Sequence, residues 1–123
     1  MRHWRLVVNR NQNLLGKLFI SLRRYEEQVA RLSREEWDDL RGEITWATEH
    51  LRGAFAPDHF NYSFLQNQDR HVHLHVIPRY ASPRRIADRH FDDSEYPGHY
   101  AVGIDRRVGS DVMAAIAAAV AGA

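Results

Sequence analysis

One seven-residue stretch alternates histidine with aliphatic residues, a pattern typical of a β-strand with one buried face. The stretch reads His71-Val72-His73-Leu74-His75-Val76-Ile77. Because successive side chains of a strand point to opposite faces, the three histidines share one face and the aliphatic residues between them share the other. The aliphatic row can anchor the strand on a layer of helices. The imidazoles are then held on a rigid support, with about 7 Å between successive Cα atoms on their face.

Three further stretches are predicted to be strands. Residues 4–9 alternate apolar and polar side chains, and the apolar run Leu18-Phe19-Ile20 follows the turn-rich sequence Asn9-Arg10-Asn11-Gln12-Asn13 and Gly16. These two strands form a predicted hairpin with a long polar connection. Residues 60–66 are the remaining strand, joined to residues 71–77 by residues 67–70. Pro78 has no amide hydrogen, so we expect it to end the histidine strand or to lie at its margin.

The best helical pattern starts at Ser33 and runs to about residue 52. Ser33 and Glu36 have the spacing of a capping box. Apolar residues then recur three and four apart, which places them on one face that should cover the sheet. These residues are Trp37, Leu40, Ile44, Ala47 and Leu51. Gly53 is the expected C-terminal cap, and Pro57 prevents the helix from continuing.

The C-terminal third of the chain gives weaker signals. Residues 83–98 are charged and turn-rich, which predicts a surface loop with solvated carboxylates at Asp92, Asp93 and Glu95. The arginines Arg79, Arg84, Arg85 and Arg89 are expected to be solvated rather than to form a rim for an anionic substrate. A short strand is expected around residues 100–104. Ser110 or Asp111 could cap a last helix with the apolar stripe Val112, Ile116 and Val120. The pattern as a whole predicts an α+β fold: an antiparallel sheet of about five strands, one long helix and a shorter C-terminal helix.

Composition limits the partners that such a chain can have. Its 123 residues fit a single domain over residues 1–123 with one core. The formal charge of +1 gives no long basic stretch for a nucleic-acid backbone, so a polyanionic partner would have to be small and locally bound. The absence of cysteine excludes disulfides and thiolate metal sites. No segment approaches the roughly 20 apolar residues of a membrane span, and the N-terminus lacks a signal-peptide run, so a cytoplasmic protein without a membrane partner is the expectation.

Imidazoles presented in this way suit group transfer, because an imidazole can be neutral when it attacks and charged when it stabilises. A nucleophilic histidine needs one free nitrogen for phosphorus and an acceptor, often a backbone carbonyl, that fixes the hydrogen on its other nitrogen. A charged neighbouring imidazole could stabilise phosphoryl oxygens or protonate a leaving group. Two other interpretations stay open: the same spacing could bind zinc or another transition metal, or it could form a purely structural row.

Residues 71–77 resemble, at every position, the motif that defines the histidine triad (HIT) family, His-φ-His-φ-His-φ-φ with φ apolar. Ile77-Pro78-Arg79 resembles the Pro-Arg ending common in the hydrolase branch of that family. Near the N-terminus, Asn9-Arg10 followed by Gly16-Lys17 resembles the hairpin with which the family contacts ribose. Together with the helix start at residues 33–37 and the stretch 61–67, the resemblance covers residues 4–80.

The resemblance implies a HIT-like fold and a nucleotide hydrolase or transferase that cleaves a phosphoanhydride or phosphoramidate at the α-phosphorus. His73 would be the nucleophile that forms a nucleotidyl-histidine, and His75 would bind phosphate oxygens or assist the leaving group. His71 would support both, with its backbone carbonyl fixing the ring hydrogen of His73. Asn9 would contact the ribose. Asn67 would offer an amide where many members have a Gln that contacts phosphate.

Lys17 departs from the family pattern, because a His usually follows the Gly at this place. A lysine could replace the charge of that imidazole but not its proton chemistry near pH 7. Phe19 or Leu18, together with Leu6, are candidates to flank the base, although all three also fit the core.

The resemblance also bears on ligands, assembly and the type of function. It implies a small nucleotide as the ligand, a homodimer as the assembly and no required cofactor or metal ligand, although Mg²⁺ could accompany a polyphosphate substrate. Two alternatives to an enzyme remain: a nucleotide-binding regulator with little turnover, and a metal-binding module.

Overall fold

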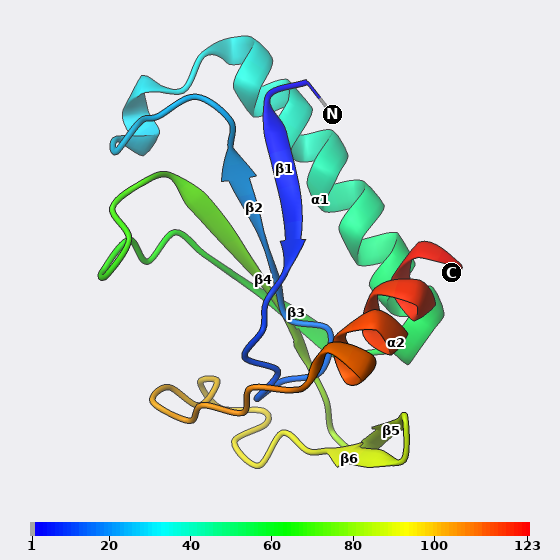
Figure 1. Cartoon of the computed structure of the whole chain (residues 1–123). Helices are drawn as coiled ribbons and strands as arrows, with labels where there is room; N and C mark the ends of the chain where they lie inside the picture. Colours follow the sequence, from blue (N-terminus) through cyan, green and yellow to red (C-terminus); the bar gives the residue numbers. More distant parts are fainter. Residues whose placement is uncertain (1) are drawn as a thin grey trace.

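The computed structural model describes residues 2–123, which contain a four-stranded antiparallel sheet with a long helix on one face (Figure 1). The strands of this sheet are β1 (Trp4–Val8), β2 (Leu18–Leu22), β3 (His59–Ser63) and β4 (His73–Arg79), in the spatial order β1-β2-β4-β3. A short 3₁₀ turn, η1 (Val29–Arg31), precedes the long helix α1 (Arg34–Phe55). A separate two-stranded sheet consists of β5 (Arg84–Ile86) and β6 (Arg89–Phe91), and the shorter helix α2 (Ser110–Ala121) follows. The α+β class is confirmed.

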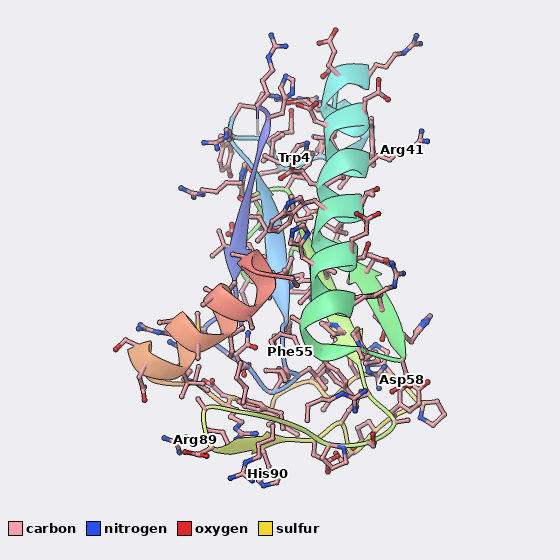
Figure 2. The ribbon with its side chains drawn as sticks, turned by 90° about the vertical axis from the view of Figure 1, so that its right-hand side faces the viewer. Trp4, Arg41, Phe55, Asp58, Arg89 and His90 are labelled. Carbon is pink, nitrogen blue, oxygen red and sulfur yellow. The ribbon has the colours of Figure 1, made fainter. Side chains whose placement is uncertain are left out.

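The core lies between the sheet and α1 (Figure 2). Trp4 of β1 is fully buried there, and its indole nitrogen donates a hydrogen bond of 2.8 Å to the backbone carbonyl of Glu36. The sheet contributes Leu18, Ile20, Leu22, Leu74 and Val76, and α1 contributes Leu40, Ala47 and Leu51. Each fully buried aliphatic side chain of this kind stabilises the fold by about 1.5–3 kcal/mol. Among the helices of residues 2–123, none has the length and apolar character needed to cross a membrane.

The start of α1 is the predicted capping box, but its end differs from the expectation. The hydroxyl of Ser33 accepts a hydrogen bond from the Glu36 amide, and the Glu36 carboxylate accepts one from the Ser33 amide. Gly53 does not cap the helix, because α1 continues to Phe55 and ends at Ala56 in the left-handed conformation with φ 49°. The extra residues are stabilised because the Phe55 side chain is buried in the core.

One residue of the expected apolar face of α1 is exposed. Trp37 is 42 % exposed and contacts the Phe64 ring edge-on at 6.4 Å, whereas Glu36 beside it is buried. The Glu36 carboxylate tolerates this position because Arg24 donates two hydrogen bonds to it, of 2.7 and 2.9 Å. These hydrogen bonds lower the pKa of Glu36 to about 2.

The two strands nearest the functional motif are displaced from their predicted limits. β4 begins at His73 instead of His71, and it includes Pro78 one residue before its end, which is the marginal place expected for a proline. The pairing of β4 with β2 ends at Val76, so the missing amide of Pro78 breaks no hydrogen bond to β2. β3 ends at Ser63, and the chain turns at Gln66, where φ is 52°.

The C-terminal third contains more structure than a surface loop. Residues 83–98 include β5 and β6, whereas residues 100–104 are irregular and form no strand. Side-chain amides of the β1–β2 connection replace strand pairing there: Asn11 donates to the carbonyl of Ile104 at 3.1 Å, and Asn13 donates to that of Ala101 at 3.3 Å. α2 is capped by the backbone of Gly109 rather than by a side chain of Ser110 or Asp111. Its predicted stripe of Val112, Ile116 and Val120 is buried.

A buried ion pair attaches this third of the chain to the sheet. Asp93, expected in solvent, is only 7 % exposed, and its carboxylate accepts hydrogen bonds of 2.7 and 3.2 Å from Arg79 and one of 3.1 Å from the amide of Tyr80. Arg79 also donates to Asn61 Oδ1 on β3 at 2.7 Å. The expectation that Asp93 and Arg79 are solvated is therefore wrong, because each neutralises the other. The guanidinium of Arg84 is also engaged, with the carbonyls that end α1, whereas Arg85 and Arg89 are exposed.

Candidate functional site

The sheet face that points away from α1 carries the histidine cluster. Leu74 and Val76 of β4 point into the core, so His73 and His75 point to the opposite face. In the register of β2 and β4, Ser21 lies opposite His73 and Phe19 lies opposite His75. The cluster therefore lies at the centre of the sheet, with one strand on its β3 side and two on the other.

The ring of His71 is held by the backbone on both nitrogens. Its Nδ1 accepts a hydrogen bond of 3.3 Å from the amide of Glu26, and its Nε2 donates one of 2.6 Å to the carbonyl of Leu22. These partners assign the hydrogen to Nε2. The ring of Tyr25 stacks on the imidazole at 5.3 Å. His71 therefore joins the start of β4 to the end of β2, and its ring has no nitrogen left for a ligand.

His73 has the arrangement that a nucleophile needs. Its Nδ1 donates to the backbone carbonyl of His71 at 2.6 Å, which leaves the lone pair on Nε2. No hydrogen bond engages Nε2 within residues 2–123. The imidazole lies edge-on to the ring of Phe19, with 5.9 Å between the ring centroids, and 4.8 Å from the ring of His75. The half-buried ring is thus oriented by its own backbone and by its neighbours.

His75 is held in its neutral form. Burial, followed by the proximity of His73 and Lys17, lowers the pKa of His75 to about 4. The pKa of Lys17 is also lowered by burial, and the carboxylate of Asp105 partly opposes that effect. The ammonium of Lys17 donates a hydrogen bond of 2.6 Å to Asn13 Oδ1. The lysine that replaces the usual histidine is therefore more acidic than a solvated lysine.

Phe19 is the only one of the three predicted base-flanking residues that shares the histidine face. Leu18 is fully buried in the core, and Leu6 lies on the core face of β1, opposite Ile20. Val7, which was not among the predicted site residues, lies opposite Phe19 and shares its face. The sequence did contain a signal for Val7, because it is an apolar residue between two core residues, Leu6 and Val8. A side chain on the sheet face opposite the core would normally be polar. Val7 and Phe19 together form an apolar shelf beside His75.

The two predicted asparagines differ in their relation to the cluster. Asn9 directly follows β1, and its amide donates to the carbonyl of Lys17 at 3.0 Å. Its side-chain oxygen accepts a hydrogen bond of 2.9 Å from the backbone amide of Asn11, which orients the side chain and leaves its NH₂ group for a ligand. Asn67 is exposed in the β3–β4 loop, and within residues 2–123 it has no hydrogen bond to the histidines.

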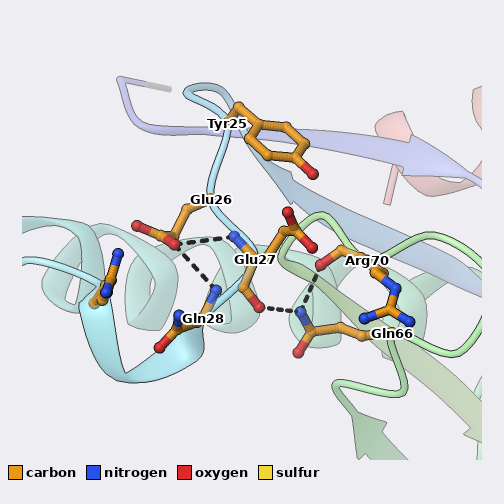
Figure 3. A pocket seen from close by; sticks show the side chains of 7 residues that line it. Tyr25, Glu26, Glu27, Gln28, Gln66 and Arg70 are labelled. Carbon is orange, nitrogen blue, oxygen red and sulfur yellow. Dashed lines mark hydrogen bonds between the residues drawn. The ribbon is translucent and has the colours of Figure 1, made fainter.

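Gln66, next to Asn67, shapes the loop instead. Its side-chain amide donates to the carbonyls of Glu27 and Arg70 at 2.6 and 2.7 Å (Figure 3). It thereby ties the β3–β4 loop to the connection between β2 and α1. The hollow drawn in Figure 3 lies between these two segments, and Tyr25 connects it to His71 through the stacked rings.

The metal-binding interpretation has no geometric support. Within residues 2–123, no group of three or more His, Asp or Glu side chains is arranged to hold a metal ion. The hydrogen bonds of His71 and His73 explain why, since three of their four ring nitrogens already have backbone partners.

The fold is similar to that of solved histidine triad proteins. A histidine triad protein from Sinorhizobium meliloti aligns with a TM-score of 0.81 and 18 % identity over 99 % of this chain and 84 % of its own. A histidine triad protein from Bradyrhizobium japonicum aligns with a TM-score of 0.76 and 19 % identity, with the same coverage of both chains. A hypothetical histidine triad nucleotide-binding protein from Sulfolobus tokodaii aligns with a TM-score of 0.67 and 10 % identity over 99 % of this chain and 80 % of its own.

Comparison by sequence adds no relative. No protein-family model and no curated protein matches the chain. The structural likenesses establish that the chain has the histidine triad fold, as the motif predicts.

Proposed function

We propose that this chain is a histidine triad protein that hydrolyses or transfers a nucleotidyl group through a covalent adduct on His73. One observation carries the proposal: the hydrogen bond of 2.6 Å from His73 Nδ1 to the His71 carbonyl, which leaves Nε2 free on the open face of the sheet. His71 differs from His73, because both of its ring nitrogens have backbone partners. The apolar shelf of Val7 and Phe19 offers a surface for a nucleobase, and Asn9 offers an amide for the ribose.

The proposed reaction has two steps. The lone pair of His73 Nε2 forms a bond to the α-phosphorus, while the bond from phosphorus to the leaving oxygen or nitrogen breaks and its electron pair goes to the leaving atom. Water then attacks the same phosphorus, the phosphorus–nitrogen bond breaks and returns its electron pair to His73, and the water loses a proton to His75, which is neutral after the first step. The products are a nucleoside monophosphate and the protonated leaving group. An acceptor other than water in the second step makes the protein a transferase.

His75 is the proposed proton donor. It is neutral in the free protein because its pKa is about 4. A bound phosphate brings negative charge to the ring and therefore raises that pKa, so His75 takes up a proton with the substrate and gives it to the leaving atom. Lys17 is proposed to hold a phosphate oxygen through its charge. Asn67 would have to turn inward to contact phosphate. These steps require no cofactor, and Mg²⁺ would enter only with a polyphosphate.

Trapping the adduct tests the proposal. Denaturation during turnover of a ³²P-labelled adenosine 5′-phosphoramidate or diadenosine polyphosphate should leave label on the protein, and His73→Asn should carry none. His90→Asn, which changes an exposed histidine of β6 outside the site, is the matched control and should label like the unaltered protein. Label that persists on the His73→Asn variant would exclude this residue as the nucleophile.

Lys17 favours one alternative function, a nucleotide-binding regulator with little turnover. Its hydrogen bond to Asn13 and its position next to His75 fit the binding of a phosphate without release of the leaving group. Rapid-mixing kinetics separate the two functions, because an enzyme gives a burst of leaving group equal to the protein concentration. Tight nucleotide binding with no burst, together with a burst in a Lys17→His variant, would support the regulator.

The proposal also includes a small nucleotide as the ligand, a homodimeric assembly and a cytoplasmic location.

A further inference from the structure

The side of the histidine cluster away from the apolar shelf is hollowed. A cavity of about 520 Å³ lies between β3 and the loop that follows β6. Its floor includes Asn61 and Ser63 of β3, and its wall includes Tyr96 and Tyr100 of the loop. In Figure 1 this loop runs below the sheet, between β6 and α2.

The cavity begins next to the proposed proton donor. Ser63 lies directly opposite His75 in the register of β3 and β4, and such pairs have Cβ atoms about 4.5–5.5 Å apart. Phe19 lies opposite His75 on the other side, in β2. His75 is therefore flanked by the shelf on one side and by the cavity on the other. A group that occupies both sides would place the bond between its two halves at the histidines.

The permanent charge in the cavity lining is balanced. Among the described residues no carboxylate lines it, and its guanidinium, that of Arg79, is neutralised by the buried carboxylate of Asp93. The lining also includes the imidazoles of His59 and His99. Arg79 also donates a hydrogen bond to Asn61 Oδ1, which orients the side chain of Asn61 and leaves its NH₂ group for a ligand. The ring of Tyr96 lies 5.7 Å from the guanidinium carbon of Arg79, which holds that ring in place. The remaining lining is rich in aromatic rings and hydroxyl groups, which suits an uncharged planar group.

We propose that this cavity receives the leaving group and favours one with an uncharged aromatic ring, stacked against Tyr100. This inference rests on the proposed function, since the cavity is a leaving-group site only if phosphorus is attacked at His73. In the first step, the bond between the α-phosphorus and the leaving nitrogen or oxygen breaks, and the leaving atom gains the proton of His75 within the cavity mouth. The aromatic ring gives selectivity through stacking and takes no part in the bond changes.

The preference of the cavity for an aromatic leaving group can be tested with two adenosine 5′-phosphoramidates. Their leaving amines, benzylamine and 2-methoxyethylamine, are similar in basicity, and only the first has an aromatic ring. Their dissociation constants are measured by calorimetry on a His73→Ala variant, which cannot form the adduct. The benzyl compound should bind about tenfold more tightly. Adding Tyr100→Ala should remove most of that ratio, and adding Tyr100→Phe should preserve it. Val102→Ala, an exposed apolar residue of the same loop outside the cavity, is the matched control and should not change the ratio.

The same pair of compounds keeps the two proposals separable. Ser63→Leu, which fills the cavity floor, should abolish the ratio even if a Tyr100 variant fails to fold. Equal binding of the two compounds would contradict the proposed role of the cavity, and so would a ratio that survives both Tyr100→Ala and Ser63→Leu. Neither result would affect the proposal that His73 forms the adduct. If the protein with His73 present forms no adduct with either compound, the proposed function fails, and the assignment of the cavity to a leaving group fails with it.

Discussion

At the scale of single residues, the environment of His75 makes a prediction about stability. The pKa of His75 is about 4 in the folded protein, against 6.5 for an unperturbed histidine. The unfolded chain therefore takes up a proton near pH 6.5, whereas the folded protein resists it until about pH 4. The contribution of His75 to stability is complete above pH 6.5 and is lost as the pH falls toward 4. We expect the free energy of unfolding in urea to decrease over this range, and to decrease less in His75→Asn.

The control for this prediction is His90→Asn, which changes an exposed histidine of β6 and should follow the unaltered protein. Lys17→Met adds an independent check, because removing the ammonium should raise the pKa of His75 as followed by NMR. A pH dependence that is the same with and without His75 would contradict the low pKa.

Residue types explain what could be predicted of the site. The alternation of His71, His73 and His75 with aliphatic residues predicted the strand and the shared face of the His73 and His75 imidazoles, because successive side chains of a strand point to opposite faces. It did not distinguish His71 from the others. The ring of His71 is engaged by Glu26 and Leu22, which are distant in sequence, so its structural position follows from tertiary contacts that no local pattern contains.

At the scale of elements, Arg84 makes a prediction about the end of α1. Its guanidinium donates hydrogen bonds of 2.8 and 2.7 Å to the carbonyls of Phe55 and Ala56, which have no partner in the helix. Hydrogen bonds to a charged group contribute about 1.5–3 kcal/mol. We therefore expect Arg84→Ala to lower the free energy of unfolding by about 2 kcal/mol, measured by urea denaturation.

The neighbouring Arg85→Ala is the matched control, because Arg85 is exposed and its ion pair within residues 2–123 is with the exposed Asp88 at 3.3 Å. A surface pair of this kind contributes little, so this variant should unfold like the unaltered protein. Equal effects of the two substitutions would show that the contact with α1 is not stabilising.

The same contact explains why the helix end was mispredicted. Gly53 is a local signal for a cap, but the carbonyls at the end of the helix accept hydrogen bonds from Arg84 of β5, which is distant in sequence. Conversely, the start of α1 was predicted correctly because Ser33 and Glu36 satisfy each other within one turn. Local sequence signals thus predicted the helix end at which the backbone groups have hydrogen-bond partners within the same turn. They failed at the end where a side chain distant in sequence supplies the partner.

At the scale of the whole molecule, the C-terminal third completes the open face of the sheet. Tyr96 and Tyr100 line the proposed leaving-group cavity. The sequence predicted a surface loop at Tyr96 and the start of a short strand at Tyr100, and neither prediction places these rings beside the histidines. Their placement depends on the buried pair of Arg79 and Asp93 and on the asparagines of the β1–β2 connection. Charged and turn-forming residues normally indicate a surface, so a loop that docks through a neutralised pair has no distinguishing pattern in sequence.

This docking predicts that removing one partner of the buried pair is far more harmful than removing both. Asp93→Ala leaves the guanidinium of Arg79 buried without a counterion and should lower the free energy of unfolding by about 3–5 kcal/mol. Arg79→Met combined with Asp93→Leu removes both charges, so it should recover much of that loss in urea denaturation. If instead the double variant is as unstable as Asp93→Ala, the ion pair itself holds the loop. In the single variant the peptide bonds around Tyr96 to Tyr100 should also become accessible to protease. The loop then detaches from β4 while the sheet and α1 remain packed against each other.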